Sequence, residues 1–441
     1  MSRAVAMLSA AMQIAQLVVV AFVVAALIVE LARRPMLIVY ALLTVHAWEL
    51  LASLPSTRVA GIGVSPADAV NVIAFGAALI RVRRGPHVWQ WALLGAIVLV
   101  LAGALRGYLL LGDAALLGFR AELYFLVPAL FVTTLTPRRV TAVVTAVIRF
   151  GAFMAVVAII RWLLIAIGAP LAPAPSGSGY VVSRVINSGA ALGVAFAAVA
   201  MLERLLAGGR ELGKFAFTPM ATVVALIVVL LAQHRSVWVA TMVMLALTFV
   251  RLPRRWALKL AVVVIAVVGV LTVEVAGLGD SGAVAESLAY AASNVGTWEG
   301  RLDRWGAVWS THAARGWEAI IVGSGYGYSW LTGAVGVWEV SPHNGFLQIA
   351  VRIGLIGAFL VFSAYAFALR RLPGHTGAMT SLLWLWTVGM IVYFIPYSGN
   401  PLTGVVLGSA VLSAVEVRAN THTAADALSI PVDSSLRSAK G

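Results

Sequence analysis

The sequence predicts an all-α, polytopic membrane protein with about 12 to 13 transmembrane helices and one large extracytoplasmic loop. Three observations predict this fold class. Of the 441 residues, 61% are hydrophobic and 11% are charged, whereas soluble globular proteins carry about 25% charged residues. Long apolar runs, such as residues 14–29 and 260–273, do not alternate with polar residues as barrel strands do. Short basic clusters separate the runs at every second junction.

Each apolar run has the length of about 20 residues that a helix needs to cross a bilayer. The expected helical cores are residues 6–30, 36–54, 64–80, 89–105, 119–136, 140–168, 185–207, 217–233, 236–252, 258–276, 343–369, 377–397 and 401–416. If one of these runs is interfacial or re-entrant, the number of spans becomes 12 rather than about 13.

The basic residues indicate which helix ends face the cytoplasm. They gather at alternate junctions: Arg33/Arg34, Arg81/Arg83/Arg84, Arg138/Arg139, Arg204/Arg210/Lys214, Arg251/Arg254/Arg255/Lys259, Arg370/Arg371 and Arg418. Cytoplasmic loops carry an excess of Lys and Arg, so we expect all of these clusters on the cytoplasmic side and the N-terminus outside. The net charge of +14 is spread over these clusters, which argues against nucleic acid as a partner.

Four parts follow from this pattern. Residues 1–276 are expected to form transmembrane helices with short loops, and residues 343–417 to form further transmembrane helices. Between them, residues 277–342 form the large extracytoplasmic (periplasmic) loop, with a helix-like stretch near 301–318. Long ordered loops on a rigid scaffold often carry function. Residues 418–441 are rich in Ser, Thr and Ala, a composition that predicts a disordered cytoplasmic tail.

Polar residues on the outer half of the protein identify a candidate site. They are Arg120, Arg161, Arg184, His234, Arg235, Arg301, Arg304 and His343. A single arginine at a helix end is explained by contact of its guanidinium with lipid headgroups. A group of arginines on the side where cations are disfavoured is harder to explain in this way. Such a group would suit a phosphate or diphosphate, because the planar guanidinium binds its oxygens bidentately.

His343 stands at the start of the helix that follows the long loop. A lone histidine at a helix start is more often a structural hydrogen-bonding residue than a catalyst. Imidazole is nevertheless the side chain best suited to accept a proton near neutral pH. Asn344, Gln348 and Arg352 follow at i, i+4 and i+8 and predict a polar stripe on one helix face. Polar side chains inside membrane helices usually face a cavity or a partner helix.

Signatures of other chemistries are absent from the sequence. There is no P-loop, no HExxH motif and no nucleophile elbow, and the chain contains no cysteine. No acidic cluster suited to Mg²⁺ is evident, so we expect no metal and no cofactor. The glycine-rich run from Gly323 to Gly327 lacks the strand–turn–helix context of a nucleotide site.

Residues 343–357 read HNGFLQIAVRIGLIG, in which His343-Asn344 precedes Gly354-x-x-Gly357. This pattern resembles the signature of the O-antigen ligase and Wzy polymerase superfamily of bacterial membrane glycosyltransferases. Three further segments resemble family motifs in order and location: Arg301 to Trp305 followed by Gly323 to Gly327 (R…W…GxGxG), His234-Arg235-Ser236 (a Ser-Arg-Gly hairpin) and Asn187 (an Asn-x-x-Ala helix start).

The resemblance covers about residues 180–370, and the first half of the chain matches only in hydropathy and helix count. Two positions depart from the family pattern. The hairpin arginine follows His234 rather than serine, and Arg352 occupies a position where the family often carries glutamate. The reversed charge indicates either a different acceptor or a different internal ion pair.

The resemblance implies a metal-independent, inverting glycosyltransferase in the bacterial cytoplasmic (inner) membrane, with its active site facing the periplasm. It would move a glycan from an undecaprenyl diphosphate-linked donor to a hydroxyl of a lipid or glycan acceptor, as in lipopolysaccharide and other cell-envelope polysaccharides. His343 would be the general base, with Arg235 as a second catalytic residue. The diphosphate would be bound by Arg184, Arg235, Arg301 and Arg304, together with Arg120 from the outer set. The acceptor or structural motif would comprise Asn187, Asn344, Gln348, Gly354 and Gly357.

Three alternatives remain open at this point. A Wzy-type polymerase of the same superfamily differs from a ligase in its acceptor, which is another glycan unit. A transporter or flippase for lipid-linked sugars is favoured less, because such proteins often consist of two related halves and no such symmetry is visible here. A non-catalytic scaffold of a cell-envelope assembly would tolerate replacement of His343.

Overall fold

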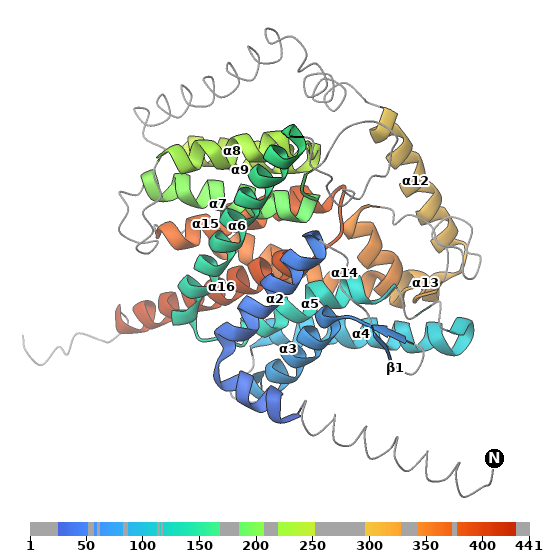
Figure 1. The fold of residues 1–441 in the computed structure, drawn as a ribbon. Coiled ribbons are helices and arrows are strands. Elements are labelled where there is room, and N and C mark those ends of the chain that lie inside the picture. The colour runs from blue at the N-terminus through green and yellow to red at the C-terminus, as the bar shows by residue number, and fades with distance from the viewer. Residues whose placement is uncertain are drawn as a thin grey trace, which may run out of the picture.

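The computed structural model describes residues 25–51, 57–59, 62–82, 87–112, 115, 118–167, 185–206, 219–251, 296–327, 343–372 and 377–428. Within these ranges the chain is almost entirely helical (Figure 1). The helices are α2 (Pro35–Leu51), α3 (Pro66–Val82), α4 (Val88–Leu111), α5 (Arg120–Thr133), α6 (Val140–Ala166, preceded by the 3₁₀ turn η2, Pro137–Arg139), α7 (Ser188–Leu206), α8 (Pro219–Leu231), α9 (Arg235–Arg251), α12 (Gly296–Ala313), α13 (Trp317–Val322), α14 (Gly345–Arg371), α15 (Ala378–Phe394) and α16 (Pro401–Leu428). One short antiparallel hairpin joins α2 to α3, with β1 (Thr57–Val59) paired to β2 (Ile62–Val64).

The predicted all-α, polytopic membrane fold is confirmed. In the described part of the chain, the helices long and apolar enough to cross a membrane are α4, α6, α7, α14 and α16, and α2, α8 and α15 are shorter apolar helices. The predicted span at 258–276 and most of the one at 6–30 lie outside the described residues. The number of spans therefore stays a prediction. Helix α16 continues to Leu428, into the segment for which the sequence predicts a disordered tail.

Helices α7 and α16 form the centre of the bundle. The fraction of residues buried inside the protein is 78% in α7 and 72% in α16, but only 33% in α4. Helix α16 lies directly against α5, because a β-carbon on Gly404 or Gly408 would overlap the α5 carbonyl oxygens of Phe125 or Ala129. Small residues four positions apart let two membrane helices approach this closely. The two helices thus form a rigid pair across the bundle.

Helix termini contact one another at both ends of the bundle. The described basic clusters lie at one end, where three contacts join the helix termini: Arg81 Nη1 to Ala32 O (3.4 Å), the stacked rings of Trp89 and Phe367 (4.5 Å), and Arg251 Nη1 to Ser381 Oγ (2.7 Å). Three other hydrogen bonds join termini at the opposite end: Arg120 Nη2 to Gly63 O (2.6 Å), Arg161 Nη1 to Val185 O (2.7 Å) and Gly345 N to Tyr397 O (2.9 Å).

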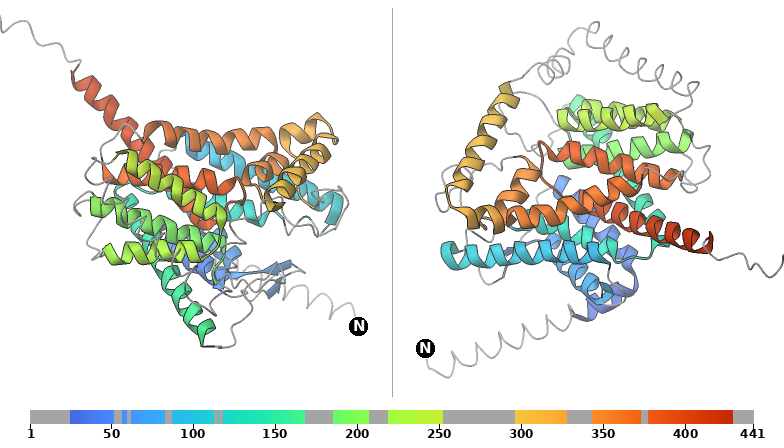
Figure 2. Two further views of the ribbon diagram at one scale, coloured as in Figure 1. Left: turned by 90° about the horizontal axis from the view of Figure 1, so that it is seen from above. Right: turned by 180° about the vertical axis from the view of Figure 1, so that it is seen from behind.

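The described part of the predicted large loop consists of α12, α13 and residues 323–327. The helix-like stretch expected near 301–318 is two helices, because the chain turns at Gly316, where φ is 97°. Helix α12 stands at the edge of the bundle beside α13 and α14 in each view (gold in Figures 1 and 2). Arg301 and Arg304 of α12 act electrostatically on His343, which precedes α14.

Candidate functional site

The starts of four helices, α7, α9, α14 and α16, meet around Tyr397 at the end of the bundle opposite the basic clusters. The ring centroid of Tyr397 is 6.4 Å from that of His234, which precedes α9, and 6.4 Å from that of His343, which precedes α14. Tyr397 stacks at 5.0 Å on Tyr393, whose hydroxyl lies 3.1 Å from Ser188 Oγ in α7. A helix N-terminus carries a positive partial charge, so this arrangement favours an anionic ligand.

His343 lies two residues before α14 in a left-handed backbone conformation, with φ of 50°. Gln233, just before His234, has φ of 57°. Both residues are therefore held in a conformation that non-glycine residues seldom adopt, and such strain concentrates at functional sites. Burial lowers the pKa of His343 below its usual 6.5, and Arg301 and Arg304 of α12 lower it further. The imidazole is thus kept neutral beside two cations.

Two residues of the predicted motif act as helix caps. Asn344 Oδ1 accepts a hydrogen bond of 2.9 Å from Leu347 N and begins α14. Asn187 Oδ1 accepts one of 3.0 Å from Ala190 N and begins α7. Each side-chain oxygen satisfies an N–H group that has no partner inside its helix. The two asparagines fix where α7 and α14 start. Asn344 thereby also fixes the position of the strained residue His343, which directly precedes it.

Gln348 and Arg352 point to buried partners. Gln348 Nε2 donates a hydrogen bond of 2.7 Å to Glu122 Oε1 of α5. Arg352 Nη1 donates one of 2.9 Å to Gly325 O, and its guanidinium lies 5.4 Å from the ring centroid of Tyr326. Glu122 and Arg352 attract each other electrostatically, and both are buried. Sequence reasoning missed Glu122, although an acidic residue within the apolar run 119–136 is a signal that could have found it.

The cluster also brings an acidic residue near Arg352. Glu122, from a different helix, attracts the Arg352 guanidinium electrostatically. Burial raises the pKa of Tyr326 well above its usual value, and the Glu122 carboxylate raises it further. Tyr326 therefore stays neutral and packs as an aromatic ring between the two charges.

The signature glycines join the large loop to α14. Gly354 interrupts α14 with φ of 72°, and a β-carbon there would overlap the carbonyl oxygen of Ile321. Gly323 has φ of 91°, and a β-carbon there would overlap the carbonyl oxygen of Arg352. A hydrogen bond of 2.8 Å from Ser324 N to Val351 O closes this contact. The other motif glycine, Gly357, has no room for a β-carbon because the side chain of Ile353 fills it.

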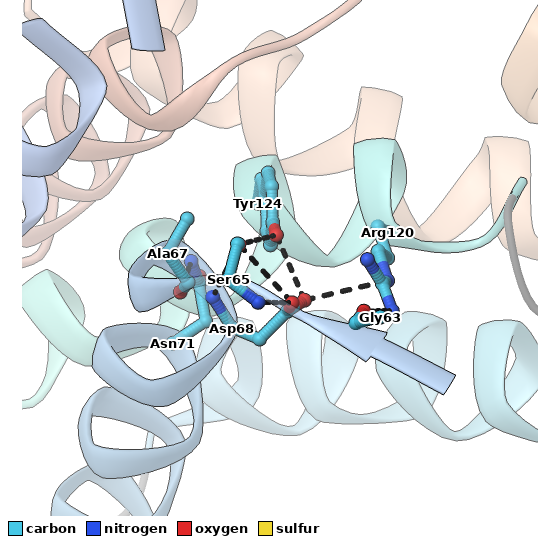
Figure 3. Close-up of polar contacts among 7 residues, drawn as sticks. All are labelled: Gly63, Ser65, Ala67, Asp68, Asn71, Arg120 and Tyr124. Atoms are coloured by element: carbon cyan, nitrogen blue, oxygen red, sulfur yellow. Dashed lines mark hydrogen bonds and ion pairs between the residues drawn. The ribbon is translucent and has the colours of Figure 1, made fainter. Parts of the chain in front are cut away.

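Arg120 belongs to a different cluster, shown in Figure 3. Its Nε lies 3.4 Å from Asp68 Oδ1, and its Nη2 donates a hydrogen bond of 2.6 Å to Gly63 O. Asp68 also accepts hydrogen bonds from Tyr124 (2.8 Å) and from the backbone of Ser65 (2.7 Å). These contacts hold the start of α3 against the start of α5. The expected role of Arg120 in binding the diphosphate stays a prediction.

Arg235 and Arg184 are the remaining predicted arginines of the site. Arg235 is the first residue of α9 and directly follows His234, whose Nε2 lies 2.9 Å from the carbonyl oxygen of Ile186. Arg235 therefore begins a helix whose preceding residue contacts the chain just before α7. Arg184 lies outside the described residues. No group of three side chains that could hold a metal ion occurs within the described ranges.

An apolar groove of about 550 Å³ begins at Asn344, the residue after His343, and runs along α14. It is lined by Trp305, Asn344, Phe346, Leu347, Ala350, Leu355, Ala358, Phe359 and Phe362. Trp305 comes from α12 and follows Arg304 in sequence. Phe359 is 72% exposed, so the groove opens to the outside of the bundle, where lipid surrounds it. The groove and the helix N-termini together suit an amphiphile with an anionic head.

Residues 220–362 match the sequence model of a family described as O-antigen ligase. The match runs from α8 to α14 and contains Arg235, Arg301, Arg304, His343 and both signature glycines. No curated protein sequence matches this chain.

Proposed function

Because residues 220–362 form a domain of the O-antigen ligase family, we propose that the chain transfers a glycan from an undecaprenyl diphosphate-linked donor to an acceptor hydroxyl. The reaction takes place at the periplasmic face of the bacterial inner membrane. The observation that carries this proposal is the position of His343, between the cations of α12 and the head of the apolar groove along α14.

The donor is an amphiphile with a charged diphosphate head and an apolar isoprenoid chain. The site has one region suited to each of these parts. The diphosphate lies at the helix N-termini around Tyr397, where Arg235, Arg301 and Arg304 supply guanidinium groups. Arg184 is a further candidate from the sequence. The isoprenoid chain follows the groove that residues from Asn344 to Phe362 line.

The chemistry needs a base and charge stabilisation. His343, which is neutral for the reasons given above, accepts the proton of the acceptor hydroxyl. The resulting oxygen attacks the anomeric carbon as the bond from that carbon to the diphosphate breaks, which inverts the anomeric centre. The arginines and helix N-termini stabilise the negative charge that the departing diphosphate gains. This mechanism requires no metal, because the cations are supplied by the protein.

The same site would serve a Wzy-type polymerase, whose acceptor is another glycan unit. The buried Glu122 and Arg352 side chains do not distinguish the two. The length of the product made from a purified donor separates them, because a ligase makes one transfer and a polymerase makes many.

The proposal is tested first by mass spectrometry of lipids that co-purify with the protein. We expect to find an undecaprenyl diphosphate glycan, and its mass would identify the donor directly. The His343→Ala variant should retain this lipid, because arginines bind it, and should lower turnover by about 10²–10⁴-fold. Folded yield is measured on the same preparation. A His343→Ala protein that binds donor and turns over at the wild-type rate would remove His343 from the mechanism.

A further inference from the structure

Helix α12 has an apolar face that the bundle covers only in part. Leu302, Trp305 and Trp309 stand at i, i+3 and i+7, so they share one face of the helix. Leu302 is 47% exposed and Trp309 is 39% exposed. The neighbouring side of α12 carries Val308 and His312, which are buried. Large apolar side chains that stay exposed together on one helix face indicate contact with another apolar phase.

The opposite face of α12 is polar. Glu299, Asp303 and Ser310 lie there, and all three are exposed. Helix α12 has 18 residues, yet it is not among the helices apolar enough to cross a membrane. It also runs across the direction of the spanning helix α4 rather than along it (Figures 1 and 2). A helix with one apolar and one polar face commonly lies in the plane of a membrane surface, with its apolar face in lipid.

Trp305 joins the apolar face of α12 to the lipid-facing surface of the bundle. Its side chain lines the same groove as Phe359 of α14, which is 72% exposed on a helix apolar enough to span the membrane. Leu302 and Trp309 flank Trp305 on α12, and they therefore open toward the same surroundings. Tryptophan is enriched where hydrocarbon meets the headgroups, because its ring is apolar and its N–H is polar. The occupant that suits this face is therefore lipid.

We propose that α12 lies in the headgroup layer of the leaflet at this end of the bundle, with Leu302, Trp305 and Trp309 inserted into lipid. The other flank of α12 carries Arg301 and Arg304, which act electrostatically on His343. The bilayer is thus the partner that holds these two arginines beside His343. The insertion does not depend on which reaction the site performs, so it goes beyond the proposed function.

Spin labels on single cysteines measure whether each face of α12 meets lipid or water, since the chain contains no native cysteine. In nanodiscs, labels on Leu302→Cys and Trp309→Cys should be relaxed mainly by oxygen, which concentrates in lipid. Labels on Asp303→Cys and Ser310→Cys should be relaxed mainly by a water-soluble nickel chelate. Phe359→Cys is the lipid-facing reference. We expect the ratio of oxygen to nickel accessibility on the apolar face to approach that of the reference and to exceed the polar-face ratio several-fold.

A pair of charged variants tests the same insertion. Leu302→Glu places a carboxylate on the face in lipid and should lower the accessibility ratio of the label on Trp309→Cys. Ala307→Glu is the matched control, because it adds the same charge to the exposed polar side of α12. It should leave the ratio unchanged. Equal lowering of the ratio by both variants would contradict the inference.

Two further outcomes of the labelling would overturn the inference. Nickel accessibility on the apolar face as high as on the polar face would show that α12 stands in water. Protection of Leu302→Cys and Trp309→Cys from both reagents would show that protein, such as a second copy of this chain, covers the face. Both outcomes leave the proposed function intact, because that is decided separately by the bound lipid and by turnover.

Discussion

His343 is held in its position by strain as well as by contacts. A non-glycine residue in the left-handed region is disfavoured by about 1–3 kcal/mol, and the conformation persists because Asn344 caps α14 immediately afterwards. Because α14 begins after this cap, His343 lies outside the helix. Its ring is consequently directed toward Tyr397, with the planes inclined at 75°. Backbone strain therefore fixes the direction in which the imidazole points.

The charges around His343 predict a shift in pH dependence. A general base must be neutral, so activity falls as the pH drops through the pKa of His343 in the folded protein. Burial, Arg301 and Arg304 hold that pKa below 6.5, and the acidic limb of the pH–activity profile should lie below this value. Arg304→Gln removes one neighbouring cation, which raises the pKa and should move the acidic limb to higher pH.

The position of the limb is read from the profile normalised to its own maximum, because Arg304→Gln also weakens donor binding. Arg33→Gln, which replaces an exposed cation at the opposite end of the bundle, serves as the control. It should leave the limb in place. An acidic limb that moved to lower pH in Arg304→Gln would contradict the assignment of His343 as the base.

At the scale of single residues, the sequence predicts His343, Arg301 and Arg304 together, because all three stand in motifs. It does not predict Glu122. That carboxylate meets Gln348 from 226 positions away, and no local spacing relates the two helices. The surroundings of His46 are similarly absent from the sequence pattern, since only helix packing decides that its ring stacks on Phe150 and that its nitrogens find no hydrogen-bond partner among the described residues. Long-range partners of this kind depend on how helices pack, which periodicity does not specify.

Helix α14 is the element in which the structure departs furthest from the sequence reading. The run 343–369 is predicted as one helix with a polar stripe, because Asn344, Gln348 and Arg352 share a helical face. The structure interrupts it at Gly354. Residues 321–323 of the large loop pack directly against the helix backbone at this interruption, rather than against side chains on the helix surface. The hydrophobic pattern continues across the break, and periodicity alone therefore cannot reveal it.

This joint predicts a stability difference between two glycines. Gly354→Ala should destabilise the protein by about 1–3 kcal/mol from backbone strain alone, and by more because the new carbon overlaps Ile321 O. Gly300→Ala in α12 meets open space, and an alanine in a helix should be neutral or slightly stabilising. Melting temperatures in one detergent measure both. A Gly354→Ala protein as stable as Gly300→Ala would show that the joint between loop and helix contributes nothing.

For the whole molecule, the distribution of charge predicts more about how the helices are arranged than the hydropathy does. Hydropathy marks helices but does not show which ones are central. Helix α7 is among the most buried because its Ala- and Gly-rich sequence lets neighbours approach on every side. The alternation of basic clusters, in contrast, predicts that Arg81 and Arg251 share one end, and the contacts of both residues lie there. The large loop must then project from the other end, together with His343.

The last prediction concerns which end faces the cytoplasm. Arginines are retained on the cytoplasmic side during insertion, so the basic end should be cytoplasmic and α12 periplasmic. Because the chain contains no cysteine, single-cysteine variants can be labelled without background by a membrane-impermeant maleimide. In spheroplasts, Ala307→Cys in α12 should be labelled directly. Glu416→Cys, near the cytoplasmic end of α16, should be labelled only after the membrane is disrupted. Both positions are exposed in the folded protein, so a difference between them reports the side of the membrane rather than burial. Labelling of Ala307→Cys only after disruption would invert the orientation and place the site where lipid-linked glycans are built instead of where they are transferred.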